Sequence, residues 1–169
     1  MKRKPQLKVE NIVHQEEVRL PPPTYGSVPL VELRQVLPTQ IAIISPSVEQ
    51  LMCFIARFRD KDGSEWDIET ALREALANAM LHGNQQDAHK HVNVACRCTP
   101  DGEVLITVQD EGSGFESGIV PDPTAPNNRM LTSGRGIYLM RMLMDEVRFE
   151  QGGALVLMRK KPNPGPVQI

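Results

Sequence analysis

The sequence has little net charge, few cysteines and no long apolar run. A net charge of −2 and a pI near 6.1 lack the basic excess of nucleic-acid-binding proteins, so we expect no direct nucleic-acid partner. No apolar run is long enough to cross a membrane, and Met1–Lys4 is followed by polar residues instead of the apolar part of a signal peptide. Three cysteines do not predict a disulfide framework. These features predict a cytoplasmic protein that does not enter the membrane.

The familiar phosphate-binding fingerprints are also missing. The chain contains no G-x-x-x-x-G-K-[ST], and no G-x-G-x-x-G follows a predicted strand. Cys96 and Cys98 alternate along a predicted strand with no second pair to complete a zinc site, so we interpret them as core residues.

Two glycine clusters stand in place of those fingerprints. Gly112 and Gly114 follow a predicted strand, and their lack of a Cβ atom lets the backbone approach a ligand closely. Gly134 and Gly136 come just before a helical pattern, whose first N–H groups can receive an anion. The 18 residues 116–133 contain three prolines and no periodicity, which is typical of a functional or disordered loop. The arrangement predicts a site for a phosphorylated ligand.

A helix upstream supplies polar side chains for such a site. The helix expected at 67–82 has an apolar stripe, and Glu74, Asn78 and His82 recur every four residues along one flank. Taken alone, Glu74 could be a solvated helix residue, but Asn78 and the glycine clusters favour a site. His82 is more typical of a helix C-terminus than of a catalyst.

The length of 169 residues indicates one domain. We expect an extended or disordered N-terminal extension at 1–37, a domain at 38–160 and a C-terminal tail at 161–169. The elements we expect, in chain order, are a strand at 40–44, a helix from 46 to about 62, a helix at 67–82, strands at 91–98 and 104–108, a helix at 137–145 and strands at 147–150 and 154–158.

Three segments in this order resemble the GHKL ATPase superfamily. They are E-x-x-x-N at Glu74 and Asn78, D-E-G-S-G-F from Asp110, and G-R-G-I-Y-L-M from Gly134. The segment ALREALANAMLHG and the short GRGIYLMR run look most like the anti-sigma-factor serine/threonine kinases of bacterial partner-switching systems. The resemblance covers residues 39–159. It implies an α+β fold of the Bergerat type, a two-layer α/β sandwich in which helices cover one face of a mixed sheet, with an ATP lid.

The resemblance also implies residues that bind ATP and Mg²⁺. Asp110 would accept a hydrogen bond from the adenine amino group, and Asn78 would coordinate Mg²⁺ through its side-chain oxygen, a hard ligand. The first glycine cluster would pass against the base and sugar, and the second would cradle the phosphates. The residues implied to bind the nucleotide are Asn78, Asp110, Gly112, Gly114, Gly134, Arg135 and Gly136.

In this family resemblance Glu74 is the catalytic base, which takes a proton from a protein hydroxyl. The implied function is that of an ATP-dependent serine/threonine kinase and anti-sigma factor, with a sigma factor and a STAS-domain antagonist as partners and a homodimer as a further expectation. Two alternatives remain open. The chain could be the ATP-binding partner of a histidine phosphotransfer system, or a non-catalytic, nucleotide-dependent protein-binding module.

Overall fold

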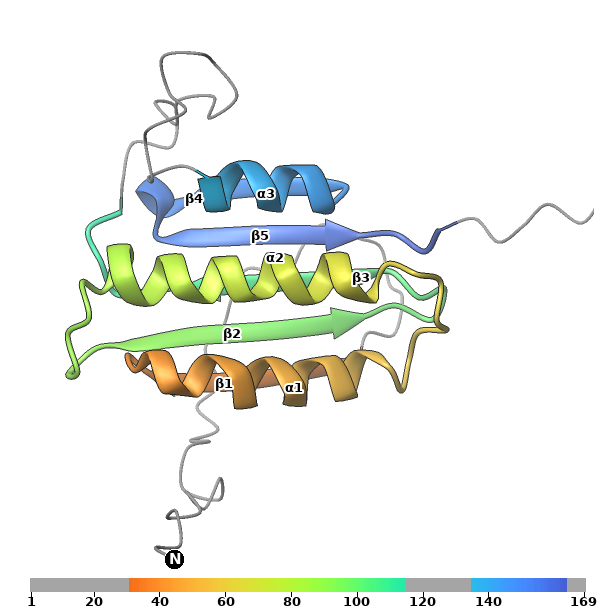
Figure 1. Cartoon of the computed structure of the whole chain (residues 1–169), viewed down its shortest axis with the longest axis horizontal. Coiled ribbons are helices and arrows are strands. Elements are labelled where there is room, and N and C mark those ends of the chain that lie inside the picture. Colours follow the sequence, from red (N-terminus) through yellow and green to blue (C-terminus); the bar gives the residue numbers. More distant parts are fainter. Residues whose placement is uncertain (1–30, 115–134, 164–169) are drawn as a thin grey trace, which may run out of the picture.

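The computed structural model describes residues 31–114 and 135–163. Within them, helices lie on one face of a five-stranded sheet (Figure 1). No described helix is long and apolar enough to pass through a membrane. The elements are β1 Val31–Pro38, η2 Ile41–Ile43, α1 Ile44–Ile55, α2 Glu65–Asn78, η3 Ala79–Gly83, β2 His91–Cys98, β3 Val104–Gln109, α3 Arg135–Leu143, β4 Glu146–Glu150, η5 Gln151–Gly153 and β5 Leu155–Lys160.

The sheet has the strand order β1-β2-β3-β5-β4, and every neighbouring pair is antiparallel. The α+β class and the two-layer arrangement were predicted correctly, but the sheet is antiparallel where a mixed sheet was expected. The connections explain this. Helices α1 and α2 run out and back, so β2 starts at the end of the sheet where β1 stops, with His91 opposite Pro38.

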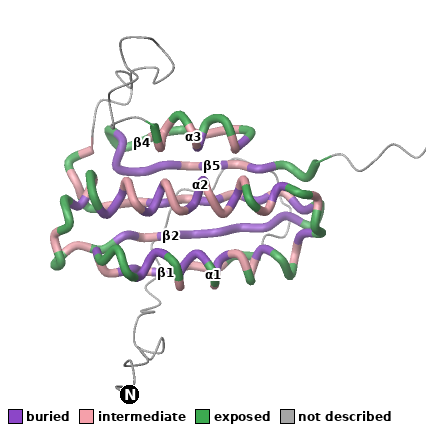
Figure 2. The backbone as a smooth tube through the Cα atoms, viewed as in Figure 1, coloured by how far each residue is buried: buried purple, intermediate pink, exposed green. Residues whose placement is uncertain are grey.

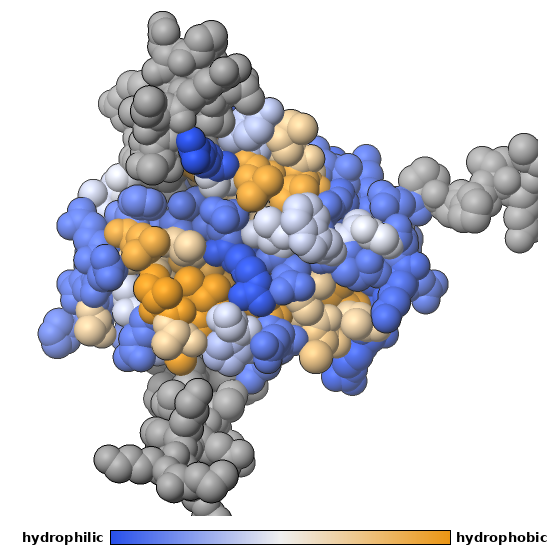
Figure 3. All heavy atoms as spheres, in the orientation of Figure 1, coloured by the Kyte–Doolittle hydropathy of each residue, from blue (hydrophilic) through white to orange (hydrophobic). Residues whose placement is uncertain are grey.

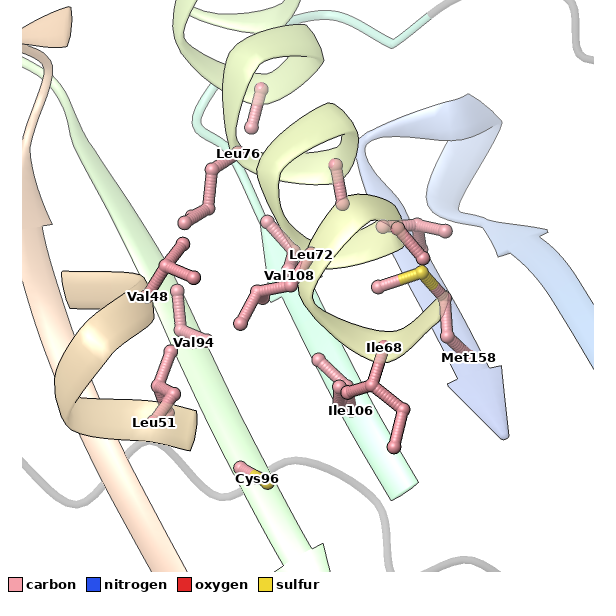
Figure 4. Packing of buried hydrophobic residues seen from close by; sticks show 14 of the residues in the cluster. Val48, Leu51, Ile68, Leu72, Leu76, Val94, Cys96, Ile106, Val108 and Met158 are labelled. Carbon is pink, nitrogen blue, oxygen red and sulfur yellow. The ribbon is translucent and has the colours of Figure 1, made fainter. Parts of the chain in front are cut away.

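The core lies between the helices and the sheet, and α2 crosses its centre (Figure 2). Ile68, Leu72 and Leu76 recur every four residues and are fully buried. They point toward the inner side chains of the strands, among them Val94 and Val108 (Figure 4). Burial of each such side chain contributes about 1.5–3 kcal/mol. Orientation of this stripe into the core places Glu74 and Asn78 on the flank of the helix.

The two cysteines interpreted as core residues, Cys96 and Cys98, are buried in this cluster, as predicted. Their side chains project from β2 toward the helices because alternate residues of a strand share one face.

The strand expected at 40–44 is wrong. This segment forms η2 and the first residue of α1, and it buries the consecutive residues Ile43 and Ile44 while Ile41 stays exposed. Consecutive burial fits a helical turn, whereas a strand would bury alternate residues. The helix expected to continue to about residue 62 ends at Ile55.

Strand β1 occupies Val31–Pro38, a region assigned from the sequence to the N-terminal extension. Its inward side chains include Leu37, which is buried in the core, and Gln35, whose Nε2 donates to Gln50 Oε1 on α1 at 2.8 Å. This stretch therefore belongs to the folded domain, while residues 1–30 lie outside the described part of the chain.

A polar network joins the segment before α2 to the end of β5. Arg59 Nη2 lies 2.6 Å from Asp62 Oδ2 and donates to Ser64 Oγ at 2.7 Å, and Lys160 Nζ contacts Asp67 Oδ2 at 2.8 Å. Burial alone would raise the pKa of Asp62, but hydrogen bonds from Ser64 and Asn163 and the charge of Arg59 lower that pKa to about 2. The network therefore requires the ionised carboxylate.

The helix-covered surface is a patchwork of apolar and charged areas (Figure 3). Apolar side chains gather between α1 and α2 and again over α3. The large apolar residues exposed on the described surface are Val31, Ile41, Trp66, Leu81, Tyr138 and Met142.

Candidate functional site

Glu74 and Asn78 lie one turn apart on the flank of α2 that faces the start of α3. Both are half-buried. A Cβ atom placed on Gly136 would lie 2.6 Å from Glu74 Oε2 and 3.2 Å from Asn78 Nδ2. Because the first distance is too short for any non-bonded contact, glycine at 136 lets α3 begin directly against both polar side chains. Three residues implied by separate sequence segments are thus brought together.

The side chains of Glu74 and Asn78 have no hydrogen-bond or ion-pair partner among the described residues. Their neighbour Arg73, in contrast, pairs with Glu69 at 2.8 Å. Half-buried polar groups usually find a partner, so these two side chains are available to a ligand. A carboxylate can accept a proton and an amide oxygen can bind a hard cation, which gives the pair two complementary uses.

Asp110 follows the last residue of β3, and the backbone at Gly83 and Gly112 packs closely against its carboxyl group. Its Oδ1 accepts a hydrogen bond from Gly112 N at 2.8 Å, and a Cβ on Gly83 would lie 2.3 Å from its Oδ2. A Cβ on Gly112 would in turn lie 2.2 Å from Gly83 O. Burial raises the pKa of Asp110, against the opposing effects of the Gly112 hydrogen bond and the charge of Lys90. The carboxyl group is therefore partly desolvated, and backbone packing fixes its orientation.

Gly114 was expected to contact a nucleotide, but in the structure it packs on the turn between β4 and β5. Its φ is +77°, and a Cβ there would lie 2.1 Å from Gly152 O. Close packing on this turn is one reason for glycine at 114, and the expected contact with a nucleotide stays a prediction.

Sequence reasoning missed Asn84, which is fully buried directly after η3. Its Nδ2 donates to Thr39 Oγ1 at 2.8 Å and to His91 O at 2.9 Å, while its Oδ1 accepts from Glu111 N at 2.8 Å. Asn84 therefore ties the end of the long helix to β1, to β2 and to the loop that carries Gly112. An asparagine after a helix end is an ordinary turn residue, so the sequence carried no signal of this role.

The residues of η3 widen the end of α2 into a π-helical turn, in which Asn84 N donates to Ala79 O at 2.7 Å. Turns of this kind are rare in proteins, and those that occur often lie at functional sites. Here the wide turn places Gly83 against the carboxyl group of Asp110. The helix predicted at 67–82 therefore exists, and its last turn is wider than an α-helix.

Comparison with known proteins decides the family. Residues 37–160 match the family model described as the histidine kinase-like ATPase domain. The chain belongs to this family. The resemblance to GHKL ATPases and the predicted fold class are confirmed.

Curated relatives of this histidine kinase-like ATPase domain are named anti-sigma F factor. The one from Clostridium perfringens strain SM101 is 34% identical over 128 residues, which are 73% of this chain and 81% of the relative. The one from Geobacillus stearothermophilus is 31% identical over 117 residues, which are 63% of this chain and 76% of the relative.

A solved structure supports the fold. The crystal structure of the RsbU and RsbW domains of a Mycobacterium tuberculosis protein matches with a TM-score of 0.55 at 21% identity. The match covers 79% of this chain, and this chain spans only 33% of that one.

The residues present fit the ATP that the family name implies. The desolvated carboxyl of Asp110 is an acceptor suited to the amino group of a base, whereas Glu74 and Asn78 face the first turn of α3, where free N–H groups favour phosphate. Gly83, beside Asp110, lies nine residues beyond Glu74, or about 13 Å along the helix. One flank of the α2–η3 helix therefore has a group that suits a base at one end and groups that suit phosphate at the other.

The role of Asn78 as a magnesium ligand stays a prediction. No group of three or more His, Cys, Asp or Glu in the described ranges could hold a metal ion. Mg²⁺ commonly takes one or two protein ligands and completes its shell with phosphate oxygens and water, which suits a single amide ligand. Of the phosphate-binding residues expected near α3, Arg135 starts the helix and is exposed, and Gly134 lies outside the described residues together with residues 116–133.

Proposed function

We propose that this protein is an ATP-dependent serine/threonine protein kinase that also binds a sigma factor, with a STAS-domain antagonist as its phosphorylation substrate. The observation that carries the proposal is the placement of Glu74. Its carboxylate is half-buried against Gly136, has no partner among the described residues, and lies one turn from Asn78. This is the arrangement expected of a base beside a metal-binding amide.

In the proposed step, the hydroxyl oxygen of a serine or threonine of the partner attacks the γ-phosphorus of ATP. A new oxygen–phosphorus bond forms, the bond from the γ-phosphorus to the β–γ bridging oxygen breaks, and ADP leaves. The hydroxyl proton passes to Glu74. Positioning and charge neutralisation carry most of such a reaction. Asn78 would contribute through Mg²⁺, and Asp110 would hold the adenine ring in register.

The partners rest on the relatives, which are named anti-sigma F factor and cover most of this chain. A sigma factor and its antagonist are thus the proposed protein partners, the cytoplasm is the proposed compartment, and self-association is a further proposal. The apolar areas between α1 and α2 and over α3 offer surface for protein contacts.

The test is phosphotransfer by purified protein in an extract of its host cells, with Mg²⁺ and γ-labelled ATP. Glu74→Gln should lower the rate of labelling of a small partner protein on the order of 10²- to 10⁴-fold while ATP binding persists, because the amide cannot accept the proton. Glu69→Gln is the matched control, since Glu69 lies on the same helix, is also half-buried and, among the described residues, pairs only with Arg73.

The chemistry of the label separates the alternatives. An acid-stable ester on a small protein whose formation is slowed only in Glu74→Gln supports the kinase. Acid-labile label would indicate histidine phosphotransfer. Absence of label from a protein that binds ATP would indicate the non-catalytic binding module, and both of these results contradict the proposal.

A further inference from the structure

The face of the sheet opposite the helices, here called the outer face, carries three rows of side chains defined by strand register. The central row runs across all five strands and has arginines at both ends. Its members are Arg34, Ala95, Thr107, Leu157 and Arg148. The flanking rows are Glu32, Arg97, Leu105, Arg159 and Glu146, and Val36, Asn93, Gln109, Leu155 and Glu150.

Several groups in the middle of the outer face are buried, although the described helices lie on the other side of the sheet (Figure 1). Leu155 is 1% exposed and Ala95 is 3% exposed, yet neither belongs to the core cluster under the helices. Arg97 is 8% exposed. Thr107 Oγ1 and Gln109 Oε1 are buried and have no hydrogen-bond partner among the described residues. Something other than the described helices therefore covers this face.

The outer face also has the layout of a contact surface, with an apolar middle and a charged rim. Leu105, Leu155 and Leu157 lie on the two adjacent central strands β3 and β5. At the edges, Arg97 Nε lies 3.3 Å from Glu32 Oε1, and Arg159 Nη2 lies 3.0 Å from Glu146 Oε2. The occupant should therefore combine apolar side chains with charges of both signs.

We propose that the outer face is the docking site of the protein's own N-terminal segment, residues 1–30. This segment joins β1 at Val31, the first residue of an edge strand, so it enters beside the outer face. Thirty extended residues reach about 100 Å, whereas five strands are only about 19 Å across. Apolar and charged residues alternate in short groups along it. Its apolar residues include Leu7, Val9, Ile12, Val13, Val18 and Leu20, and its acidic residues are Glu10, Glu16 and Glu17.

The proposal goes beyond the kinase site and does not depend on it. The family model matches only from residue 37, so the docked segment is outside the common domain. The candidate site lies between α2 and α3 on the opposite side of the sheet, and docking would leave it accessible. The segment would, however, exclude a second copy or another protein from the outer face.

Photo-cross-linking of the full chain tests the occupant. p-Benzoylphenylalanine is placed at Leu157, half-buried in the middle of the outer face, and at exposed Met142 on α3 as the control. After irradiation of dilute protein, the Leu157 probe should give monomer-sized products that join it to residues 1–30, and the Met142 probe should not. Dimer-sized products would assign the face to a second copy. That result, or cross-linking no stronger than the control, overturns the proposal.

Limited trypsin digestion gives a second, independent readout. Leu157→Glu should increase the rate of cleavage after Arg19 about tenfold, because it removes one apolar contact of the docked segment. Met142→Glu, an equivalent change on the other face, should leave that rate unchanged. Circular dichroism establishes that both variants fold. A folded Leu157→Glu protein with the wild-type cleavage rate would overturn the proposal.

Discussion

Replacement of Gly136 by alanine separates the stability of the fold from the chemistry of the site. The added Cβ would lie 2.6 Å from Glu74 Oε2 and 3.2 Å from Asn78 Nδ2. Both atoms are at the ends of side chains that can rotate away, and no backbone atom is in the way. Gly136→Ala should therefore displace the Glu74 carboxylate and the Asn78 amide while α2 and α3 stay in place.

The effect on stability should be small and favourable. Gly136 is the second residue of α3, and its φ is not in the positive range that would strain alanine. In a helix interior alanine is favoured over glycine by about 1 kcal/mol, and near a helix end the gain is smaller. We expect an unfolding free energy between the wild-type value and about 1 kcal/mol above it.

The effect on phosphotransfer should be large. A displacement of about 1 Å at a catalytic group can reduce a rate on the order of a hundredfold. We therefore expect kcat to fall by about that factor in Gly136→Ala. In the Glu74→Gln protein, Gly136→Ala should not cause this further fall in kcat. The base that the added methyl group would displace is then absent, so the effects of the two changes are not additive.

The assays are urea unfolding and single-turnover transfer of label from γ-labelled ATP to the partner identified above. Wild-type transfer by Gly136→Ala would refute the reasoning, because Glu74 would then tolerate displacement. A full further loss in the Glu74→Gln background would also refute it, since alanine would then act through another part of the site. Marked destabilisation would show that the contact between α2 and α3 is too rigid to adjust.

Three further predictions concern the surroundings of the site and the far end of the sheet. ATP affinity, measured by calorimetry, should rise with pH through the pKa of Asp110, which lies above its ordinary value of 3.8, because the ionised carboxylate is the stronger hydrogen-bond acceptor. Asp110→Asn should remove this dependence, because an amide does not titrate. Asn84→Ala should lower the unfolding free energy by about 2–3 kcal/mol in urea titrations, because buried donors and acceptors lose their partner. Asp62 has its pKa lowered to about 2, so its contribution to stability is present above 3.8 and is lost as pH falls toward 2. After allowance for screening near the surface, Asp62→Asn should cost about 1 kcal/mol at neutral pH and nothing at the acid end of that window, and a pH-independent cost would contradict this account.

Periodic segments were the predictable part of the fold. The helix expected at 67–82 spans Glu65–Gly83 when η3 is included, and the strands expected at 91–98 and 104–108 are β2 and β3 within one residue. In each of these segments the apolar residues recur with the period of a helix or with that of a strand, but not with both. The pattern of apolar residues therefore predicts the local conformation correctly. The four-residue spacing of Glu74 and Asn78 likewise predicted a shared flank.

Strand β1 was placed in the N-terminal extension and η2 was predicted as a strand, because their sequence patterns conflict with their structure. In β1 the inward position of Gln35 interrupts the apolar alternation, and its Nε2 donates to Gln50, which lies on another element. In η2 a β-branched run resembles a strand, although its last residues are buried by the helix they lead into. A short apolar run cannot be assigned from periodicity alone, since only its tertiary partners decide between the two structures.

The glycines of the candidate site show how far sequence can be taken toward function. Gly112 and Gly114 stand in one motif, and the sequence suggested one ligand-binding reason for both. The structure gives them different neighbours, because Gly112 packs against Gly83 and the Asp110 carboxyl, whereas Gly114 packs against the Gly152 carbonyl. Gly136 lies against Glu74, and the sequence does not show this contact because the two residues are far apart along the chain. A glycine cluster therefore indicates that backbones approach closely there. Only the contacts show which glycine shapes the ligand site and which serves a turn of the protein itself.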